Sequence, residues 1–108
     1  MKRIDFLIMN EVTDDDKCFV DLYSDLKRNN VVKVTKMEFE KSLKKLIDMK
    51  LINCIEVKYF VKDGKRQARG VIVKDYSDVL FKDYYYSLSS LGREEIDKEE
   101  YIKWYPVY

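Results

Sequence analysis

Residues 34–52, VTKMEFEKSLKKLIDMKLI, restrict the fold more than any other stretch of this chain. Thr35 and Glu38 have the spacing of a capping box, in which a hydroxyl and a carboxylate bind two free backbone N–H groups at a helix start. A helix is therefore predicted to begin near Lys36. The apolar residues within it recur with the 3.6-residue period and share one stripe: Phe39, Leu43, Leu46 and Ile47. We expect this stripe to face a core.

The opposite side of the predicted helix is mostly basic. At about 100° per residue, that side carries Met37, Lys41, Lys44, Lys45 and Asp48. Such a face either lies in solvent, as most lysine-rich helix exteriors do, or docks against a partner. Residues 36–75 hold eleven basic and six acidic groups, while the whole chain has a net charge of only +1. This distribution suits a polyanionic partner, although near-neutrality argues against strong non-specific affinity for DNA.

The composition excludes several classes of protein. A chain of 108 residues is expected to form one domain. It contains no histidine, which removes the imidazole base, the usual nucleophile pairs and a common zinc ligand. Cys18 and Cys54 are isolated, so we expect two free, buried thiols and neither a disulfide framework nor a metal site. We therefore expect no enzyme activity, no cofactor and no metal.

The sequence shows neither a membrane-spanning segment nor a secretory signal. Its longest uncharged stretch, residues 84–92, is far shorter than the roughly 20 residues that cross a bilayer. We expect a cytoplasmic protein without a membrane partner.

The first half of the chain is predicted to be helical. Residues 2–12 have helical apolar spacing. Thr13 is followed by three aspartates, and a hydroxyl cap with negative charge in the first turn predicts a second helix over residues 14–28. Residues 31–34 form a β-branched run that predicts a short strand or an extended turn.

The second half is predicted to contain strands and one last helix. Residues 51–62 alternate in part, Asp63-Gly64 is typical of a tight hairpin turn, and residues 67–74 supply a return strand. The hairpin tip is basic, with Lys62, Lys65, Arg66 and Arg69.

We assign no structure to residues 74–83. Residues 84–88 predict a further strand, and a last helix is predicted from about Arg93, with Glu94 and Glu95 in its first turn. Its apolar side consists of Ile96, Tyr101, Ile102, Trp104 and Tyr105. These side chains either pair with a second copy of the chain or cover the domain's own core.

This order of elements is that of a winged helix–turn–helix domain, and two motifs resemble bacterial regulators of the MarR and PadR type. Residues 35–52 resemble their recognition helix, which typically ends in Leu-x-x-x-Gly-Leu-Ile; Lys50 stands where the family usually has Gly. Residues 86–96, YSLSSLGREEI, are similar to the family's Tyr-x-Leu-Thr-x-x-Gly-Arg-Glu-x-Leu. The resemblance covers roughly residues 13–96.

The resemblance implies an α+β winged helix–turn–helix fold: a three-helix core, an antiparallel β-hairpin wing with an extra strand, and a C-terminal helix. Residues 1–108 would form a single winged-helix domain, with 93–108 as the terminal helix and tail.

The resemblance also implies a homodimeric transcriptional regulator that binds double-stranded DNA. The helix over residues 36–50 would enter the major groove, and the hairpin tip over residues 62–69 would act as the wing. The implied DNA-binding residues are Lys36, Met37, Lys41, Ser42, Lys44, Lys45, Lys65, Arg66 and Arg69. The implied dimer interface is Ile96, Tyr101, Ile102, Trp104 and Tyr105.

Three features depart from the family pattern. Glu38 and Glu40 place negative charge at the end of the helix that would enter DNA, the net charge is close to zero, and residues 70–83 make a long connection after the wing. The alternative hypothesis is therefore a winged-helix adaptor that binds protein and not DNA.

Overall fold

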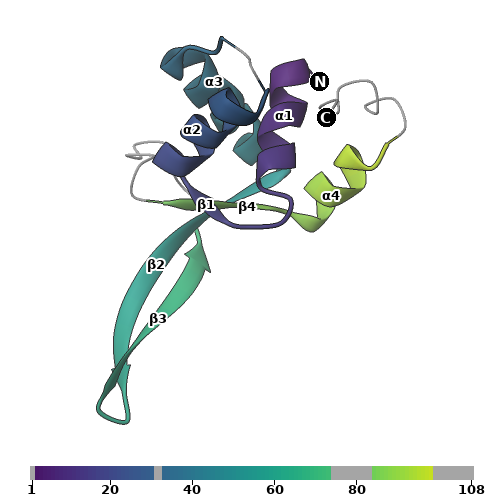
Figure 1. Cartoon of the computed structure of the whole chain (residues 1–108). Coiled ribbons are helices and arrows are strands. Elements are labelled where there is room, and N and C mark those ends of the chain that lie inside the picture. The colour runs from purple at the N-terminus through teal and green to yellow at the C-terminus, as the bar shows by residue number, and fades with distance from the viewer. Residues whose placement is uncertain (1, 31–32, 74–83, 99–108) are drawn as a thin grey trace.

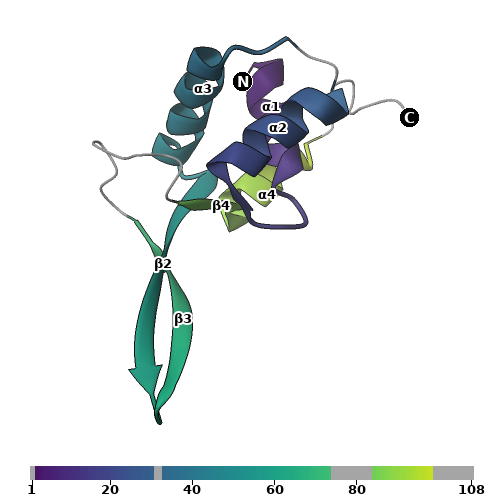
Figure 2. The ribbon, with the colours of Figure 1, turned by 60° about the vertical axis from the view of Figure 1, so that its left-hand side comes forward.

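The structure, a computed structural model, describes residues 2–30, 33–73 and 84–98. A body of helices carries a long two-stranded hairpin that projects away from it (Figure 1), and the same projection is seen after a 60° turn (Figure 2). The elements are α1 (Arg3–Glu11), β1 (Lys17–Cys18), α2 (Phe19–Asn30), α3 (Lys36–Asp48), β2 (Ile52–Lys62), β3 (Lys65–Ile72), β4 (Tyr85–Leu88) and α4 (Ser90–Ile96). This order confirms the predicted α+β fold.

One apolar core joins the helices to the start of the sheet. The side chains that α1 buries are mostly apolar: Phe6, Leu7, Ile8 and Met9. α3 buries the predicted stripe of Phe39, Leu43, Leu46 and Ile47. Aromatic rings connect α2 to α3, because the rings of Phe19 and Tyr23 have their centroids 5.1 and 5.0 Å from that of Phe39. The stripe seen in the sequence is therefore the side of α3 that faces the core.

Both ends of α3 follow from local chemistry. Thr35 Oγ1 accepts a hydrogen bond from the backbone N–H of Glu38 at 3.1 Å, as the predicted cap requires. After the helix, Lys50 has a φ of +64°, in the left-handed region that favours glycine. The regulators that the sequence resembles usually carry Gly at this position, and the backbone conformation explains why.

The sheet has the strand order β1-β4-β2-β3, and β2 is its longest strand. The first part of β2, from Ile52 to Ile55, pairs with β4 on one side. From Ile55 to Lys62 it pairs with β3 on the other side, which makes a two-stranded hairpin over residues 55–72. We call these residues the hairpin. Beyond Ile55, neither of its two strands pairs with another described strand.

The hairpin turn has the conformation that its sequence predicts. Asp63 and Gly64 both have positive φ, 53° and 75°, as the two central residues of a type I′ turn require. The strand predicted over residues 84–88 is also confirmed, as β4.

The predicted helix over residues 14–28 begins too early. α2 starts only at Phe19, and the preceding Lys17 and Cys18 form β1, which pairs with Tyr86 and Tyr85. The Thr13 hydroxyl donates to the carbonyl of Met9 at 3.2 Å, so it satisfies the end of α1 and does not cap α2. Cys18 therefore lies in a strand, contrary to the prediction of a helix.

Lys17 anchors β1 to the helices. Its ammonium lies 3.1 Å from Glu11 Oε2 on α1 and 2.9 Å from Asp25 Oδ2 on α2. Burial works to lower the pKa of Lys17, but the hydrogen bonds to Asp25 and Glu11 outweigh it, and the pKa is raised. The hydrogen bond with Lys17 in turn lowers the pKa of Asp25 below its ordinary value of 3.8.

The last helix also differs from its prediction. α4 begins at Ser90 instead of Arg93, because Ser89 caps it by accepting a hydrogen bond from the backbone N–H of Gly92 at 2.9 Å. Glu94 and Glu95 consequently lie near its C-terminal end, since the helix ends at Ile96. The rest of the predicted tail, together with residues 31–32 and 74–83, lies outside the described part of the chain.

The motif at α4 fastens that helix to two distant parts of the chain. Ser89 Oγ lies 2.6 and 2.9 Å from the carbonyl oxygens of Lys50 and Leu51. Arg93 donates to the carbonyl of Thr13 at 2.9 Å. A Cβ on Gly92 would lie 2.1 Å from the Leu51 carbonyl oxygen, so only glycine fits there. The spacing of Ser, Gly and Arg in this motif therefore reflects how α4 docks.

Candidate nucleic-acid interface

The outward side of α3 is exposed as predicted. Met37 is 78% exposed, and Lys36, Lys41 and Lys44 are also exposed, while Ser42 is half-buried. Lys36 leans back over the body, since its Nζ lies 5.9 Å from the centroid of the Phe19 ring. This side therefore presents positive charge and one large apolar side chain, Met37.

Lys45 is bound to α1. Its Nζ lies 2.6 Å from Oδ2 of Asp5, whose side chain is fully buried. The same oxygen accepts a hydrogen bond from the backbone N–H of Lys2 at 3.0 Å. The sequence predicted that Lys45 contacts DNA; in the structure its ammonium holds α1 and α3 together.

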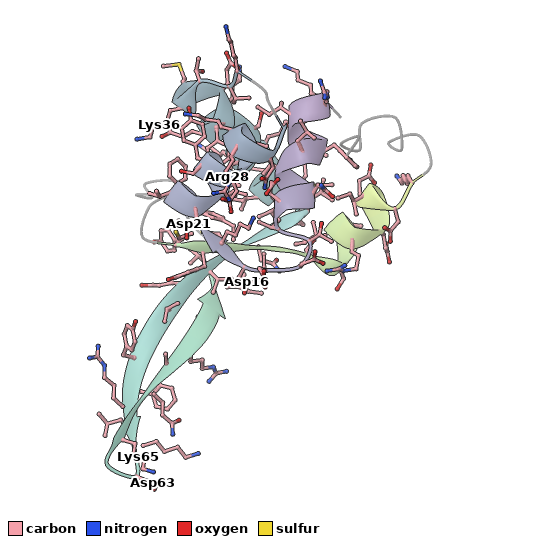
Figure 3. All side chains as sticks on the ribbon, in the orientation of Figure 1. Asp16, Asp21, Arg28, Lys36, Asp63 and Lys65 are labelled. Carbon is pink, nitrogen blue, oxygen red and sulfur yellow. The ribbon has the colours of Figure 1, made fainter. Side chains whose placement is uncertain are left out.

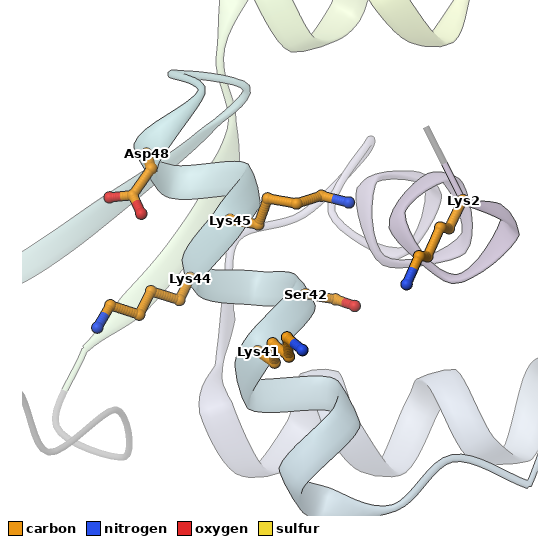
Figure 4. Close-up of a pocket in the computed structure, with 6 residues that line it drawn as sticks. All are labelled: Lys2, Lys41, Ser42, Lys44, Lys45 and Asp48. Carbon is orange, nitrogen blue, oxygen red and sulfur yellow. The ribbon is translucent and has the colours of Figure 1, made fainter.

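A hollow of about 290 Å³ lies beside this ion pair. It is lined by Lys2, Lys41, Ser42, Lys44, Lys45 and Asp48. Lys2, Ser42 and Lys45 point into the space between α1 and α3, whereas Lys44 and Asp48 extend from the other side of α3 (Figure 4). We call the hollow that these six residues line the α1–α3 hollow. The sequence did not single out Lys2, because its position depends on how the two helices pack.

The hairpin has two chemically different faces. Residues directly opposite each other in an antiparallel pair share a face. One face carries the pairs Lys58–Arg69 and Lys62–Lys65, with Phe60–Gln67 between them and Glu56–Val71 nearer the body. We call it the basic face, after its four cations. The other carries Val57–Gly70, Tyr59–Ala68 and Val61–Arg66, and we call it the apolar face.

The register separates residues that the sequence grouped together. Lys65 and Arg69 lie on the basic face, but Arg66 lies on the apolar face with its guanidinium 4.4 Å from the centroid of the Tyr59 ring. Tyr59 and Arg66, with Gln67 and Ala68, line a hollow of about 300 Å³. Lys58 joins the basic face although it was not predicted as a site residue. The period-two alternation from Lys58 to Lys62 was the signal that could have identified it.

Among the described residues, the basic face keeps an excess of positive charge, with four cations and one carboxylate, Glu56. Within the described part of the chain, no ion pair involves its four cations, in contrast to Lys17, Arg28 and Lys45. Lys65 lies at the tip and Lys36 at the start of α3, at opposite ends of the molecule (Figure 3). The tip of the hairpin is therefore far from the start of α3.

Burial raises the pKa of the Cys54 thiol to about 11, so it is protonated at neutral pH. Among residues 2–30, 33–73 and 84–98, no three His, Cys, Asp or Glu side chains gather as a metal ion would require. None of the helices in these ranges has the length and apolar character needed to cross a membrane.

Ile96 belongs to the core of its own chain. Ile96 is 2% exposed, so it packs into the core of its own domain. This is the second of the two alternatives that the sequence left open for the last helix. The other four residues predicted for a dimer interface, at 101, 102, 104 and 105, lie outside the described part of the chain.

No protein-family model and no curated protein sequence matches this chain. Solved structures that share its fold include the following two. A PadR family transcription regulator from hypervirulent Clostridium difficile R20291 superposes with a TM-score of 0.56 at 20% identity, over 93% of this chain and 88% of that one. The protein smu.1704 from Streptococcus mutans UA159 superposes with a TM-score of 0.52 at 18% identity, over 86% of this chain and 68% of that one. The chain therefore has the winged-helix fold of a PadR-type regulator, as predicted.

Proposed function

We propose that this chain is a small transcriptional regulator that binds double-stranded DNA with α3 in the major groove and the hairpin as wing. Its fold is that of a PadR family transcription regulator, which supports this class of function. The proposal includes a homodimer and a cytoplasmic location.

The observation that carries the proposal is the pairing of like charges on the basic face. Lys58 lies directly opposite Arg69, and Lys62 lies directly opposite Lys65. Like charges at such positions destabilise an antiparallel pair. A polyanion on this face removes the repulsion, and the phosphates of DNA supply that charge at regular intervals.

The outward side of α3 is suited to DNA of almost any sequence. Lys41 and Lys44 supply charge for phosphate contacts, and the exposed Met37 can contact a thymine methyl group in the major groove. Glu38 is exposed and Glu40 is half-buried at the end of α3 that would enter the groove. We therefore propose that α3 contributes affinity and little discrimination between sequences.

A titration against non-specific duplex DNA at two salt concentrations tests the proposal. The logarithm of the affinity should fall linearly with the logarithm of salt, with a slope of about −0.9 per phosphate contact. Arg69→Gln should reduce that slope by about 0.9, whereas Arg66→Gln, three residues away on the apolar face, should leave it unchanged. Absence of binding at about 50 mM salt would overturn the proposal.

The apolar face favours a protein-binding adaptor as the second candidate function. Tyr59 is 62% exposed and Val61 is 74% exposed, and Ile72 is 57% exposed nearer the body. Exposed apolar surface of this kind marks interaction sites on soluble proteins. If the titration finds no DNA binding, this face becomes the leading candidate for a partner-protein site.

A further inference from the structure

We infer that the α1–α3 hollow holds a phosphate group of the DNA backbone, and that Lys2 on α1 is a DNA-contacting residue there. The inference rests on the proposed function and adds to it a helix outside the helix–turn–helix and the wing. It identifies which lysines near α3 act on DNA and which one acts within the protein.

The hollow offers the donors that a phosphate requires. Lys2, Lys41 and Ser42 line it, together with Lys44, Lys45 and one carboxylate residue, Asp48. Lys2 and Ser42 point into the same space from α1 and α3 (Figure 4), whereas the Lys45 ammonium is already bound to Asp5. Lysine binds phosphate as a point charge and a hydroxyl adds a directed hydrogen bond. Lys2 and Lys41 are exposed, so the site is open to a large ligand.

The charge at this site remains positive after its internal pair is counted. Asp5 is fully buried beside the hollow, and its Oδ2 is bound by Lys45 and by the backbone N–H of Lys2. Lys45 balances that carboxylate. Within the described residues no ion pair involves Lys2 or Lys41, and their two charges are left for a ligand.

Asp5 acts as a positioning residue for the site. It draws Lys45 towards α1 and fixes the backbone at Lys2, which sets the two walls of the hollow at their separation. Its second oxygen, Oδ1, is buried and has no hydrogen-bond partner among the described residues. Burying a carboxylate in this way costs free energy, and its contacts with Lys45 and with the backbone of Lys2 hold α1 beside α3 at the hollow.

The location of the hollow favours a DNA phosphate over a small free anion. Lys41 and Ser42 belong to α3, and their side of the helix adjoins the exposed side that carries Met37 and Lys44. A helix in the major groove is flanked by the phosphates of both strands. A phosphate beside α3 would then lie next to α1, where Lys2 reaches it.

Comparison of Lys2→Gln with Arg3→Gln tests the inference. Arg3 is also exposed at the start of α1 but does not line the hollow, so its removal changes the net charge equally without removing the contact. With duplex DNA, we expect Lys2→Gln to reduce the salt slope by about 0.9 and to weaken binding to all sequences alike. Arg3→Gln should leave the slope unchanged, and melting temperatures should match the wild type.

The outcomes separate this inference from the proposed function. If Arg69→Gln lowers the slope but Lys2→Gln behaves as Arg3→Gln does, the function stands and the phosphate site is wrong. If the wild type binds no duplex, both fall. Free inorganic phosphate is the other possible ligand of the hollow. A titration with inorganic phosphate, monitored through the NMR signals of Lys2 and Ser42, tests it. One combined result would overturn the inference and make the hollow a small-anion site. In that result, phosphate causes saturable shifts in the wild type that Lys2→Gln abolishes, while the salt slope of Lys2→Gln for duplex DNA equals that of the wild type.

Discussion

Gly92 occupies a position at which any side chain would meet the backbone of another element. Its neighbour is the Leu51 carbonyl oxygen, 2.1 Å from where a Cβ would lie. Helix propensity alone would make Gly92→Ala stabilising by about 1 kcal/mol. Overpacking against a backbone atom costs about 1–3 kcal/mol, and we expect this cost to exceed the gain in helix propensity. Urea unfolding should show a lower free energy of unfolding for Gly92→Ala.

Gly70 provides the matched control for this substitution. A Cβ there would lie 3.0 Å from Cγ2 of Ile55, a side-chain methyl that can shift, on an exposed strand. Gly70→Ala should therefore change the free energy of unfolding much less than Gly92→Ala does. Equal or greater stability for Gly92→Ala would show that α4 does not dock on Leu51 as described.

Local chemistry explains which single residues could be assigned from the sequence. Thr35 as a helix cap and Asp63-Gly64 as a hairpin turn were predicted because each acts on neighbours in the chain. The role of Gly92 could not be derived in this way, since the atom that excludes a side chain belongs to the distant Leu51. The resemblance marked the position without giving its reason.

The contact between α1 and α3 depends on the pair Asp5–Lys45. Lys45→Met leaves the fully buried Asp5 carboxylate without its cation, which costs about 3–5 kcal/mol for an enclosed pair. Lys45 is 44% exposed, so we expect a smaller loss, about 2 kcal/mol. Asp5→Asn should cost less, because the freed lysine can turn to water. The double variant should recover part of the loss in a double-mutant cycle.

Lys41→Met is the control for that cycle. Lys41 lies on the same helix, is exposed and forms no ion pair among the described residues, so its loss should change stability by less than about 0.5 kcal/mol. Denaturant unfolding of all four variants gives the comparison. If Lys45→Met and Lys41→Met have the same free energy of unfolding, the pair Asp5–Lys45 does not stabilise the fold. Lys45 would then be available to DNA, as the sequence predicted.

Elements were predictable where their pattern is continuous in sequence. α1, α3 and the hairpin were predicted because their periodicity, caps and turn are all local. The two-residue β1 was missed, since only its pairing with Tyr85 and Tyr86 makes it a strand. The aspartates after Thr13 indicated a helix start, but that pairing delays the helix to Phe19. In the same way, the alternation of β2 indicated a strand without showing that two different strands pair with it.

At the scale of the whole molecule, the hairpin and the helical body are expected to be energetically separate. Every β2 residue beyond Val57 and every β3 residue is exposed. Replacing residues 57–70 by Asn-Gly joins Glu56 to Val71, which already face each other in the hydrogen-bonded type of pair that a two-residue turn closes. The melting temperature should stay nearly unchanged. The salt slope for duplex DNA should fall by up to about 3.6, for the four cations of the basic face, which are lost together with Arg66.

A full-length variant with Tyr59→Ser and Val61→Ser provides the control for the shortened chain. It keeps the basic face and removes only exposed apolar side chains, so duplex affinity should persist. Loss of affinity in this variant equal to that of the shortened chain would place the DNA contact on the apolar face. A marked drop in melting temperature of the shortened chain would make the hairpin part of the folding unit.

Because β3 lies at an edge of the sheet, the charges of the wing are also expected to oppose aggregation. β3 is one of the two edge strands of the described sheet, and an exposed edge of this length can template pairing with another copy and start aggregation. Lys65, Arg66 and Arg69 place like charges along that edge and repel a second β3. Neutralising the wing is therefore expected to lower solubility as well as DNA affinity. Binding measurements on such variants need a check for monodispersity at every protein concentration used.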